Sequence, residues 1–162
     1  GDHRDLHRLI RRQRQMCIRD RLNIAVEEIM SELLVRVKED LSVGKAAHML
    51  LRHRINGILV VDKENEDKVV GIFTTGDLLR LADVILAEGS GRITALDKLS
   101  AMPVGKVASR DIISLQKGAK VTKALAIMNN KNAHTIPIYD GDNLIGVIGR
   151  HDILNAAFYH GS

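Results

Sequence analysis

Residues 71–77 read GIFTTGD and residues 146–152 read GVIGRHD, and this pair of stretches decides the fold. Each begins with a glycine and a short apolar run, typical of a strand, and leads into a helical pattern of leucine, isoleucine and alanine. A strand that ends at a helix N-terminus leaves backbone N–H groups unpaired beside the positive end of the helix dipole. Phosphate suits such a corner, and an aspartate in the first turn can accept hydrogen bonds from a ribose diol. A single copy would more often be a helix cap without a ligand, but two copies favour a binding role.

The duplication extends beyond these two stretches. Residues 43–47 match residues 121–125 at an offset of 78, whereas the glycines that open the two stretches are 75 positions apart. The difference of three falls in a polar loop at residues 63–68 of the first copy, where a change of length costs little. The chain is therefore an internal repeat of two similar units.

Apolar periodicity predicts the same order of elements in both units. In the first we expect a helical lead-in at 26–31, a strand at 34–37, a helix after the N-cap Ser42, strands at 58–61 and 69–73, and a helix at 76–87. After a connector at 88–103 we expect a strand at 112–115, a helix at 121–130, strands at 136–139 and 144–148, and a helix at 150–159. The continuous apolar run at 58–61 predicts a strand buried on both faces.

Composition limits the possible classes of protein. The 162 residues are 45% apolar but only 2% aromatic, so the core must be aliphatic. No apolar run has the length of a membrane span, and no signal-peptide pattern is present, so we expect no membrane partner.

Residues 1–21 differ from the rest. They show no clean amphipathic period, and RQRQMCIRDR at residues 12–21 resembles the in-frame translation of a transposon-end sequencing adapter. We therefore expect residues 1–21 to be non-native or disordered and exclude them from the fold. The competing interpretation is a basic arm that binds nucleic acid.

The charge of residues 1–21 bears on whether this chain binds nucleic acid. The segment holds seven arginines and three aspartates, a charge of +4 that equals the net charge of the whole chain. The remainder is neutral and gives no electrostatic reason to expect nucleic acid. The single cysteine, Cys17, also lies there, so the globular part has no disulfide, thiolate nucleophile or cysteine metal site, which fits a reducing cytoplasm.

The pattern Gly-apolar-apolar-Ser/Thr-x-x-Asp at 71–77, set in a duplicated strand–helix order, resembles the CBS domain, the βαββα unit named after cystathionine β-synthase. Two in tandem look like a Bateman module, and the resemblance covers about residues 26–160. It implies an α/β (α+β) fold of two repeats related by a pseudo-twofold axis, with repeat 1 at 22–87, the connector at 88–103 and repeat 2 at 104–160.

The resemblance also implies roles for residues of the first repeat. Thr74 would contact a phosphate group and Asp77 would hold the ribose hydroxyls. Asn56, Gly57 and Ile58 would line the adenine pocket. The alternative for Thr74 is that it only caps the helix that follows.

In the second repeat Asp152 keeps the ribose position, but Gly149 stands where the hydroxyl of the pattern should be. Cations near a phosphate form charge-assisted contacts, and three side chains could compensate in this way: Arg150, His151 and His134. His134, Thr135 and Ile136 occupy the adenine positions, and Arg36 and Ser114 sit at equivalent points beside the first strands. His134 is explained equally well as a surface residue. Since His48 and His53 are five residues apart, we expect no metal site there.

Catalysis finds little support, because the globular part has no Gly-x-Ser-x-Gly, no His-Glu-x-x-His and no P-loop. We therefore expect no enzyme and no required cofactor. The resemblance implies a stand-alone regulatory module that binds AMP, ADP or ATP, or else S-adenosylmethionine or NAD(H), in the cleft between the repeats and signals by a conformational or oligomeric change. It also implies a homodimer, with a regulated protein as a further partner. The alternative is a ligand-free module for protein interaction or dimerisation, through exposed helix faces at Leu78, Leu81, Val84, Leu154 and Phe158.

Overall fold

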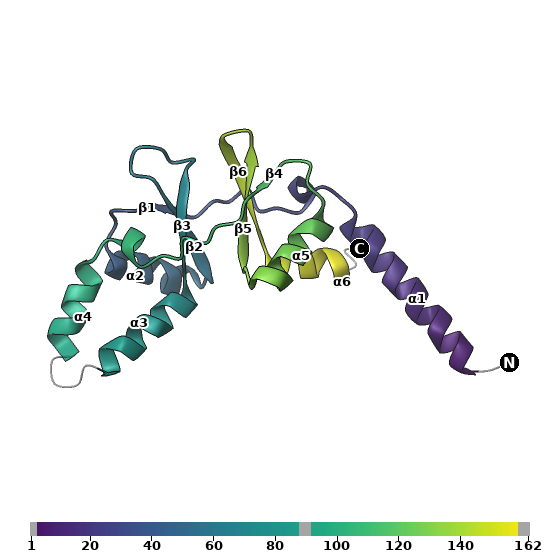
Figure 1. Ribbon diagram of the computed structural model, residues 1–162, viewed down its shortest axis with the longest axis horizontal. Helices are drawn as coiled ribbons and strands as arrows, with labels where there is room; N and C mark the ends of the chain where they lie inside the picture. Colours follow the sequence, from purple (N-terminus) through teal and green to yellow (C-terminus); the bar gives the residue numbers. More distant parts are fainter. Residues whose placement is uncertain (1–2, 88–91, 159–162) are drawn as a thin grey trace. The chain divides into compact units, whose positions relative to one another are not determined.

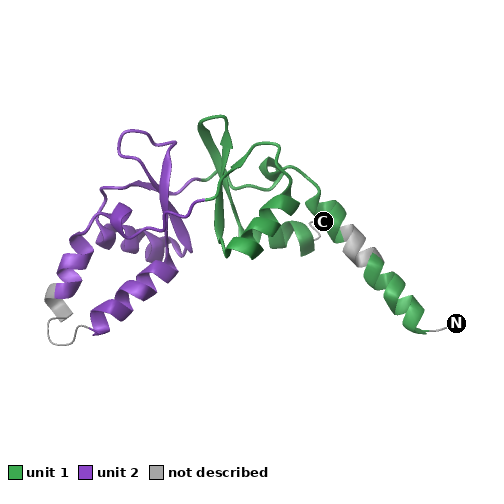
Figure 2. Ribbon diagram, viewed as in Figure 1, with its two compact units in different colours: residues 1–33, 113–162 green, residues 34–112 purple. Residues whose placement is uncertain are grey.

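The structure is a computed structural model that describes residues 3–87 and 92–158 (Figure 1). The chain forms two compact units, one of residues 34–112 and the other of residues 1–33 together with 113–162 (Figure 2). Each unit contains one three-stranded sheet with helices, so the expected α/β fold is confirmed.

The unit of residues 34–112 follows the expected order. Its elements are β1 (Arg36–Lys38), α2 (Val43–His53), β2 (Gly57–Val61), β3 (Val69–Thr74), α3 (Thr75–Ala87), α4 (Arg92–Ala101) and a 3-10 turn at Val104–Lys106. The central strand β2 runs parallel to β1 and antiparallel to β3. Residues 58–61 are at most 3% exposed, so the prediction of a strand buried on both faces is confirmed. The Ser42 hydroxyl accepts a hydrogen bond from the Lys45 N–H at 3.4 Å, which confirms the predicted N-cap.

The other unit repeats this order around a second sheet. Its elements are α1 (His3–Leu22), a 3-10 turn at Val26–Glu28, β4 (Leu115–Gln116), α5 (Val121–Lys131), β5 (Thr135–Asp140), β6 (Asn143–Gly149) and α6 (Arg150–Phe158). The strand β5 is central, parallel to β4 and antiparallel to β6. The turn between β5 and β6 places Gly141 at φ 62°, a conformation that favours glycine.

Residues 3–21, expected to lie outside the fold, belong to the helix α1. Its C-terminal end is anchored to the rest of the unit. Leu22 is 3% exposed within the core, and the Arg21 guanidinium donates to the Ala157 carbonyl at 3.2 Å. The segment is therefore helical rather than disordered, while its non-native origin stays a prediction.

The strand β4 is shorter than β1, its counterpart in the other sheet, and one residue accounts for the difference. Leu59 of β2 donates its backbone N–H to Val35 at 3.1 Å, which ties the incoming chain to the central strand. Pro137 of β5 stands 78 positions later and has no N–H to donate. Pairing with β5 accordingly begins only at Leu115, so Ser114, the equivalent of Arg36, lies outside the strand.

Each sheet also pairs with a short segment from the beginning of the other sequence repeat. Ser31 exchanges two backbone hydrogen bonds with Val147 of β6, at 2.8 and 3.0 Å. Ser109 exchanges two with Ile72 of β3, at 2.9 and 3.0 Å. The compact units therefore do not coincide with the two stretches of sequence that repeat.

These crossing segments explain the glycines that open the two repeated stretches. A β-carbon on Gly71 would lie 2.9 Å from that of Ala108, and one on Gly146 would lie 2.4 Å from the Met30 sulfur. Neither distance leaves room for a side chain. The glycines thus allow a neighbouring segment to approach closely, a packing role separate from any anion site.

Candidate functional site

The N-terminus of α3 is closed by a reciprocal pair of hydrogen bonds between Thr74 and Asp77. The Asp77 backbone N–H donates to Thr74 Oγ1 at 3.3 Å, and Asp77 Oδ2 accepts from the Thr74 N–H at 2.8 Å and from its hydroxyl at 3.1 Å. This is the geometry of a capping box, which satisfies two donors that the helix would otherwise leave unpaired. Thr74 therefore does cap the helix, as the alternative interpretation expected. The two side chains predicted to bind a ligand, Thr74 and Asp77, lie together.

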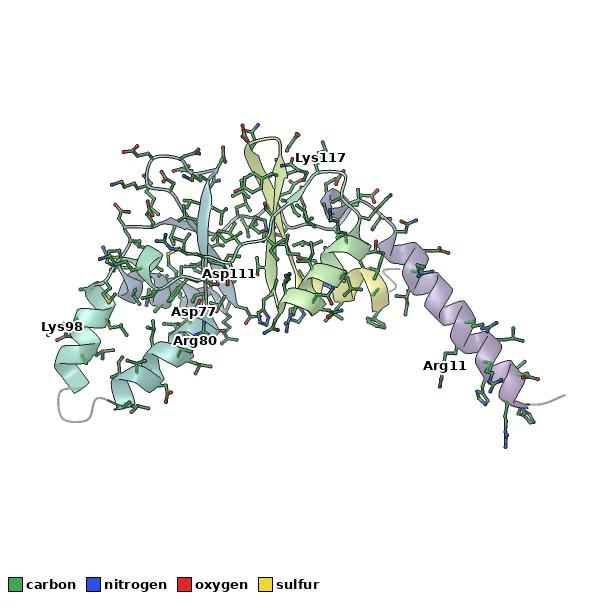
Figure 3. The ribbon with its side chains drawn as sticks, viewed as in Figure 1. Arg11, Asp77, Arg80, Lys98, Asp111 and Lys117 are labelled. Carbon is green, nitrogen blue, oxygen red and sulfur yellow. The ribbon has the colours of Figure 1, made fainter. Side chains whose placement is uncertain are left out.

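Asp77 is the buried charged residue of the site. It is 4% exposed, and its second oxygen, Oδ1, forms an ion pair with the guanidinium of Arg80 one turn along α3 (Figure 3). The Arg80 side chain is 72% exposed. A buried carboxylate is normally paired in this way, and here both of its oxygens are occupied.

The predicted adenine residues of the first repeat lie beside this helix start. Gly57 pairs with Thr74 across β2 and β3, and the Asn56 carbonyl accepts a hydrogen bond from the Thr75 N–H at 3.0 Å. Asn56 is exposed, whereas Ile58 is 1% exposed within the core. Ile58 therefore offers a ligand almost no accessible surface, in its backbone or in its side chain.

Arg36 contacts a different part of the same unit, the loop between β2 and β3. Its guanidinium donates to the Glu66 carbonyl at 3.1 Å and pairs with the Asp67 carboxylate at 3.4 Å and with the Glu66 carboxylate at 3.8 Å. These contacts hold the loop between β2 and β3. No contact joins Arg36 to Thr74 or Asp77 among those that the structure gives.

The same loop has its own internal hydrogen bonds. Asp62 Oδ1 accepts from the backbone N–H groups of Glu64 and Asn65 at 2.9 and 3.2 Å. The bond from Glu64 is the main reason that the pKa of the Asp62 carboxyl lies below its usual value. Arg36 and Asp62 thus explain the longer loop of the first repeat as an ordered turn.

The N-terminus of α6 repeats only half of the cap. Asp152 Oδ2 accepts from the Gly149 N–H at 2.7 Å, but Gly149 has no hydroxyl to complete the box. Asp152 is half-buried, and no ion pair involves it within the described ranges 3–87 and 92–158. Its carboxylate is therefore less completely engaged than that of Asp77.

Two cationic side chains stand near this second helix start. The Arg150 guanidinium donates to the Asn132 side-chain oxygen at 3.2 Å. The pKa of the His134 imidazole is lowered by desolvation and, to a smaller extent, by the charge of Arg150. His134 is therefore close enough to Arg150 for the two charges to repel, and an anion between them would relieve that repulsion.

The remaining candidates of the second repeat divide by exposure. Thr135 pairs with Gly149 across β5 and β6, as Gly57 pairs with Thr74. Ile136 is fully buried, backbone included, whereas His151 and Ser114 are exposed. The helix start and the beginning of β5 thus come together, and Ser114 lies one residue before β4.

Arg80 is the site residue that sequence reasoning missed. Its spacing of three from Asp77 places both side chains on one face of a helix, so this signal was available in the sequence. Across the described part of the chain, no group of three or more His, Cys, Asp or Glu side chains is placed to hold a metal ion. Among the same residues, no helix combines the length and the apolar character needed to cross a bilayer.

With this geometry in hand, comparison with known proteins identifies the class of the chain. The CBS domain family matches residues 26–83 and again residues 104–159. The chain therefore belongs to the CBS-domain family and carries two such domains in tandem, as the resemblance implied.

Among curated proteins, the inosine-5'-monophosphate dehydrogenase of Methanocaldococcus jannaschii is 29% identical over 134 residues. The match spans 82% of this chain but only 23% of that enzyme. Among solved structures, CBSX2 in complex with AMP is similar with a TM-score of 0.67 and 23% identity, covering 83% of this chain and 96% of that one. The CBS domain pair of protein MJ0100, in complex with 5'-methylthioadenosine and S-adenosylmethionine, has a TM-score of 0.62 and 23% identity over 81% of this chain and 97% of that one.

Proposed function

We propose that this chain is a regulatory module that binds an adenine nucleotide such as AMP, ADP or ATP, with its stronger site at the N-terminus of α3. The observation that carries the proposal is the buried Asp77 carboxylate held beside the Thr74 hydroxyl at a helix start. Two structurally similar proteins support a ligand of this class. CBSX2 was solved in complex with AMP, and the CBS domain pair of MJ0100 with 5'-methylthioadenosine and S-adenosylmethionine.

The physical basis is a division of the ligand among three neighbouring groups. The positive end of the α3 dipole and the Thr74 hydroxyl suit a phosphate. Asp77 suits the ribose diol, because a carboxylate accepts two hydrogen bonds from vicinal hydroxyls. The exposed start of β2, at Asn56 and Gly57, offers backbone groups to adenine. S-adenosylmethionine and NAD(H) share the adenosine part and remain alternative ligands.

The second repeat would bind the same ligand less tightly. Asp152 keeps the ribose contact, but Gly149 offers no hydroxyl, so phosphate would depend on Arg150, His151 and His134. Binding would regulate a partner protein only if the nucleotide prefers one conformation or one oligomeric state of the module. A homodimer in the cytoplasm is the form in which we expect it to act.

Thermal unfolding of the whole chain with AMP, ADP, ATP, S-adenosylmethionine and NADH tests the proposal. A ligand that binds only the folded state raises Tm as its concentration rises. We expect a rise with at least one nucleotide, lost in Asp77→Asn and retained in Asp152→Asn. A Tm that no member of the panel moves would contradict the proposal.

A second candidate function is a module that binds another protein without a nucleotide. It is favoured by large apolar side chains that remain exposed on α3 and α6, namely Leu79, Val84, Leu86, Leu154 and Phe158. The expectation that Leu78 and Leu81 belong to such a face is wrong, because both pack against the core of their own unit. A partner whose affinity is the same with and without nucleotide would favour this function.

A further inference from the structure

We propose that Arg80 makes the site on α3 selective for phosphorylated adenine compounds over unphosphorylated ones, an inference that rests on the proposed function. Arg80 neither belongs to the repeated motif nor has an equivalent in the second repeat, where Asn155 stands 75 positions later. Its position must therefore be explained by the first site alone.

Both oxygens of the Asp77 carboxylate already have partners. Oδ2 accepts two hydrogen bonds from Thr74, and Oδ1 pairs with the Arg80 guanidinium. When the Thr74 hydroxyl turns to a phosphate, Oδ2 keeps the bond from the Thr74 N–H, and a ribose diol can donate one hydrogen to each carboxylate oxygen. At Oδ1 the ribose meets the Arg80 guanidinium, which we expect it to displace.

The displaced guanidinium remains close to the place that suits a phosphate. A β-carbon added to Gly76 would lie 3.5 Å from Thr74 Oγ1 and 3.9 Å from Arg80 Nη1. The hydroxyl and the guanidinium therefore flank the same small space over the first turn of α3. Since the Arg80 side chain is 72% exposed, it can swing over this space without disturbing the core.

Binding is then an exchange of partners for the arginine. A nucleotide breaks the pair between Asp77 and Arg80 and supplies a phosphate, with which guanidinium forms strong two-pronged hydrogen bonds. A nucleoside breaks the same pair and supplies no replacement. The cost of displacing Arg80 applies to both ligands, but only the nucleotide offsets it, so Arg80 favours the nucleotide.

The second repeat lacks this exchange. Asn155 carries no charge, and Asp152 is more exposed than Asp77 and joins no ion pair within the part of the chain that the structure covers. A ribose can reach Asp152 without displacing a cation. The second site should therefore distinguish a nucleotide from a nucleoside less strongly by this route.

The test is calorimetric titration of AMP and adenosine into Asp152→Asn, so that the first site reports, with and without Arg80→Gln. Arg80→Gln should tighten adenosine by about threefold, since the ion pair with the largely exposed Arg80 no longer has to break. The ratio of the adenosine Kd to the AMP Kd should fall by about tenfold, the size of one charge-assisted contact. Lys98→Gln on α4, distant from Asp77 in Figure 3, removes the same charge and should leave the ratio unchanged.

Arg80→Lys is a second variant that tests the inference if Arg80→Gln does not fold. It keeps the charge but not the two-pronged geometry, so its ratio should lie between those of the unchanged chain and Arg80→Gln. Placing an arginine in the second repeat, Asn155→Arg in an Asp77→Asn background, should raise the ratio there. If AMP binds but Arg80→Gln weakens both ligands equally, this inference is overturned and the proposed function stands. If neither ligand binds the unchanged chain, the proposed function fails and takes the inference with it.

Discussion

The starts of α3 and α6 occupy equivalent places in two copies of one fold, and they differ in how completely their aspartates are engaged. Asp77 is 4% exposed, is capped by a threonine and is paired with an arginine. Asp152 is half-buried and accepts from a glycine N–H. The repeated aspartate preserves the helix cap in both units, while the surrounding residues decide what else the carboxylate can do.

The sharpest difference between the two sheets lies at Leu59 and Pro137. Leu59→Pro should lower the free energy of unfolding by about 3 kcal/mol, because it removes the hydrogen bond to Val35 and places a ring against that carbonyl. Urea denaturation measures the loss. Pro137→Leu, the reverse change, should cost less than about 1 kcal/mol, and an equal loss from both would show that the two strands do not differ in this way.

The crossing segments can be tested at the two glycines. Gly71→Ala should cost about 2 kcal/mol, since its methyl group would meet the Ala108 β-carbon at 2.9 Å and that side chain has no rotamer to adopt. Gly146→Ala should cost about half as much, because the nearest atom belongs to the flexible Met30 side chain. Thermal unfolding of both variants gives the comparison. A larger loss at Gly146 than at Gly71 would contradict it.

Exchanging the caps separates stability from binding. Gly149→Thr should complete the second capping box, for which there is room, since the nearest atom to its β-carbon is Asp152 Oδ2 at 3.6 Å. We expect a gain of about 0.5 kcal/mol and tighter nucleotide binding at the second site. Thr74→Gly should cost only a few tenths of a kcal/mol, about 0.3, yet weaken nucleotide binding strongly. Parallel stability and affinity measurements that moved together would indicate that the threonine is a cap only.

The smallest expected effect concerns pH and His134, which replaces Asn56. Because the pKa of His134 is lowered in the folded chain, the unfolded chain takes up the proton first as pH falls below about 6.5. The contribution of His134 to the free energy of unfolding is therefore fully present above that pH and declines below it. The difference in Tm between the unchanged chain and His134→Asn, followed from pH 8 to 5, should change only below about 6.5. A bound phosphate would raise the same pKa, so AMP should bind the second site more tightly in mild acid.

The sequence predicted the fold well because aliphatic periodicity and duplication carry it. The strand at 58–61 and the N-cap Ser42 were both deduced from residue types that have few alternatives. Strand lengths were less accurate, because the hydrogen bond that Pro137 lacks involves a residue far away in sequence.

The site was only partly visible in the sequence. Thr74 and Asp77 are local in sequence, so the motif brought them together correctly, and the start of β2 joins them through strand pairing. Arg36 was assigned to the ligand through the family resemblance. Its charge is engaged by the loop carrying Glu66 and Asp67, and its ligand role stays a prediction. Arg80 was missed because the motif ends at Asp77, although the helix continues on the same face.

The crossing segments have a consequence for the order in which the chain is made. Residues around Ser31 leave the ribosome more than a hundred residues before Val147, the strand residue with which they pair. The first sheet is likewise incomplete until Ser109 has emerged. Each sheet therefore completes its pairing only when a segment of the other sequence repeat has also been synthesised. Either sequence repeat, expressed by itself, would present a sheet edge with free backbone groups, and such an edge invites pairing with another chain.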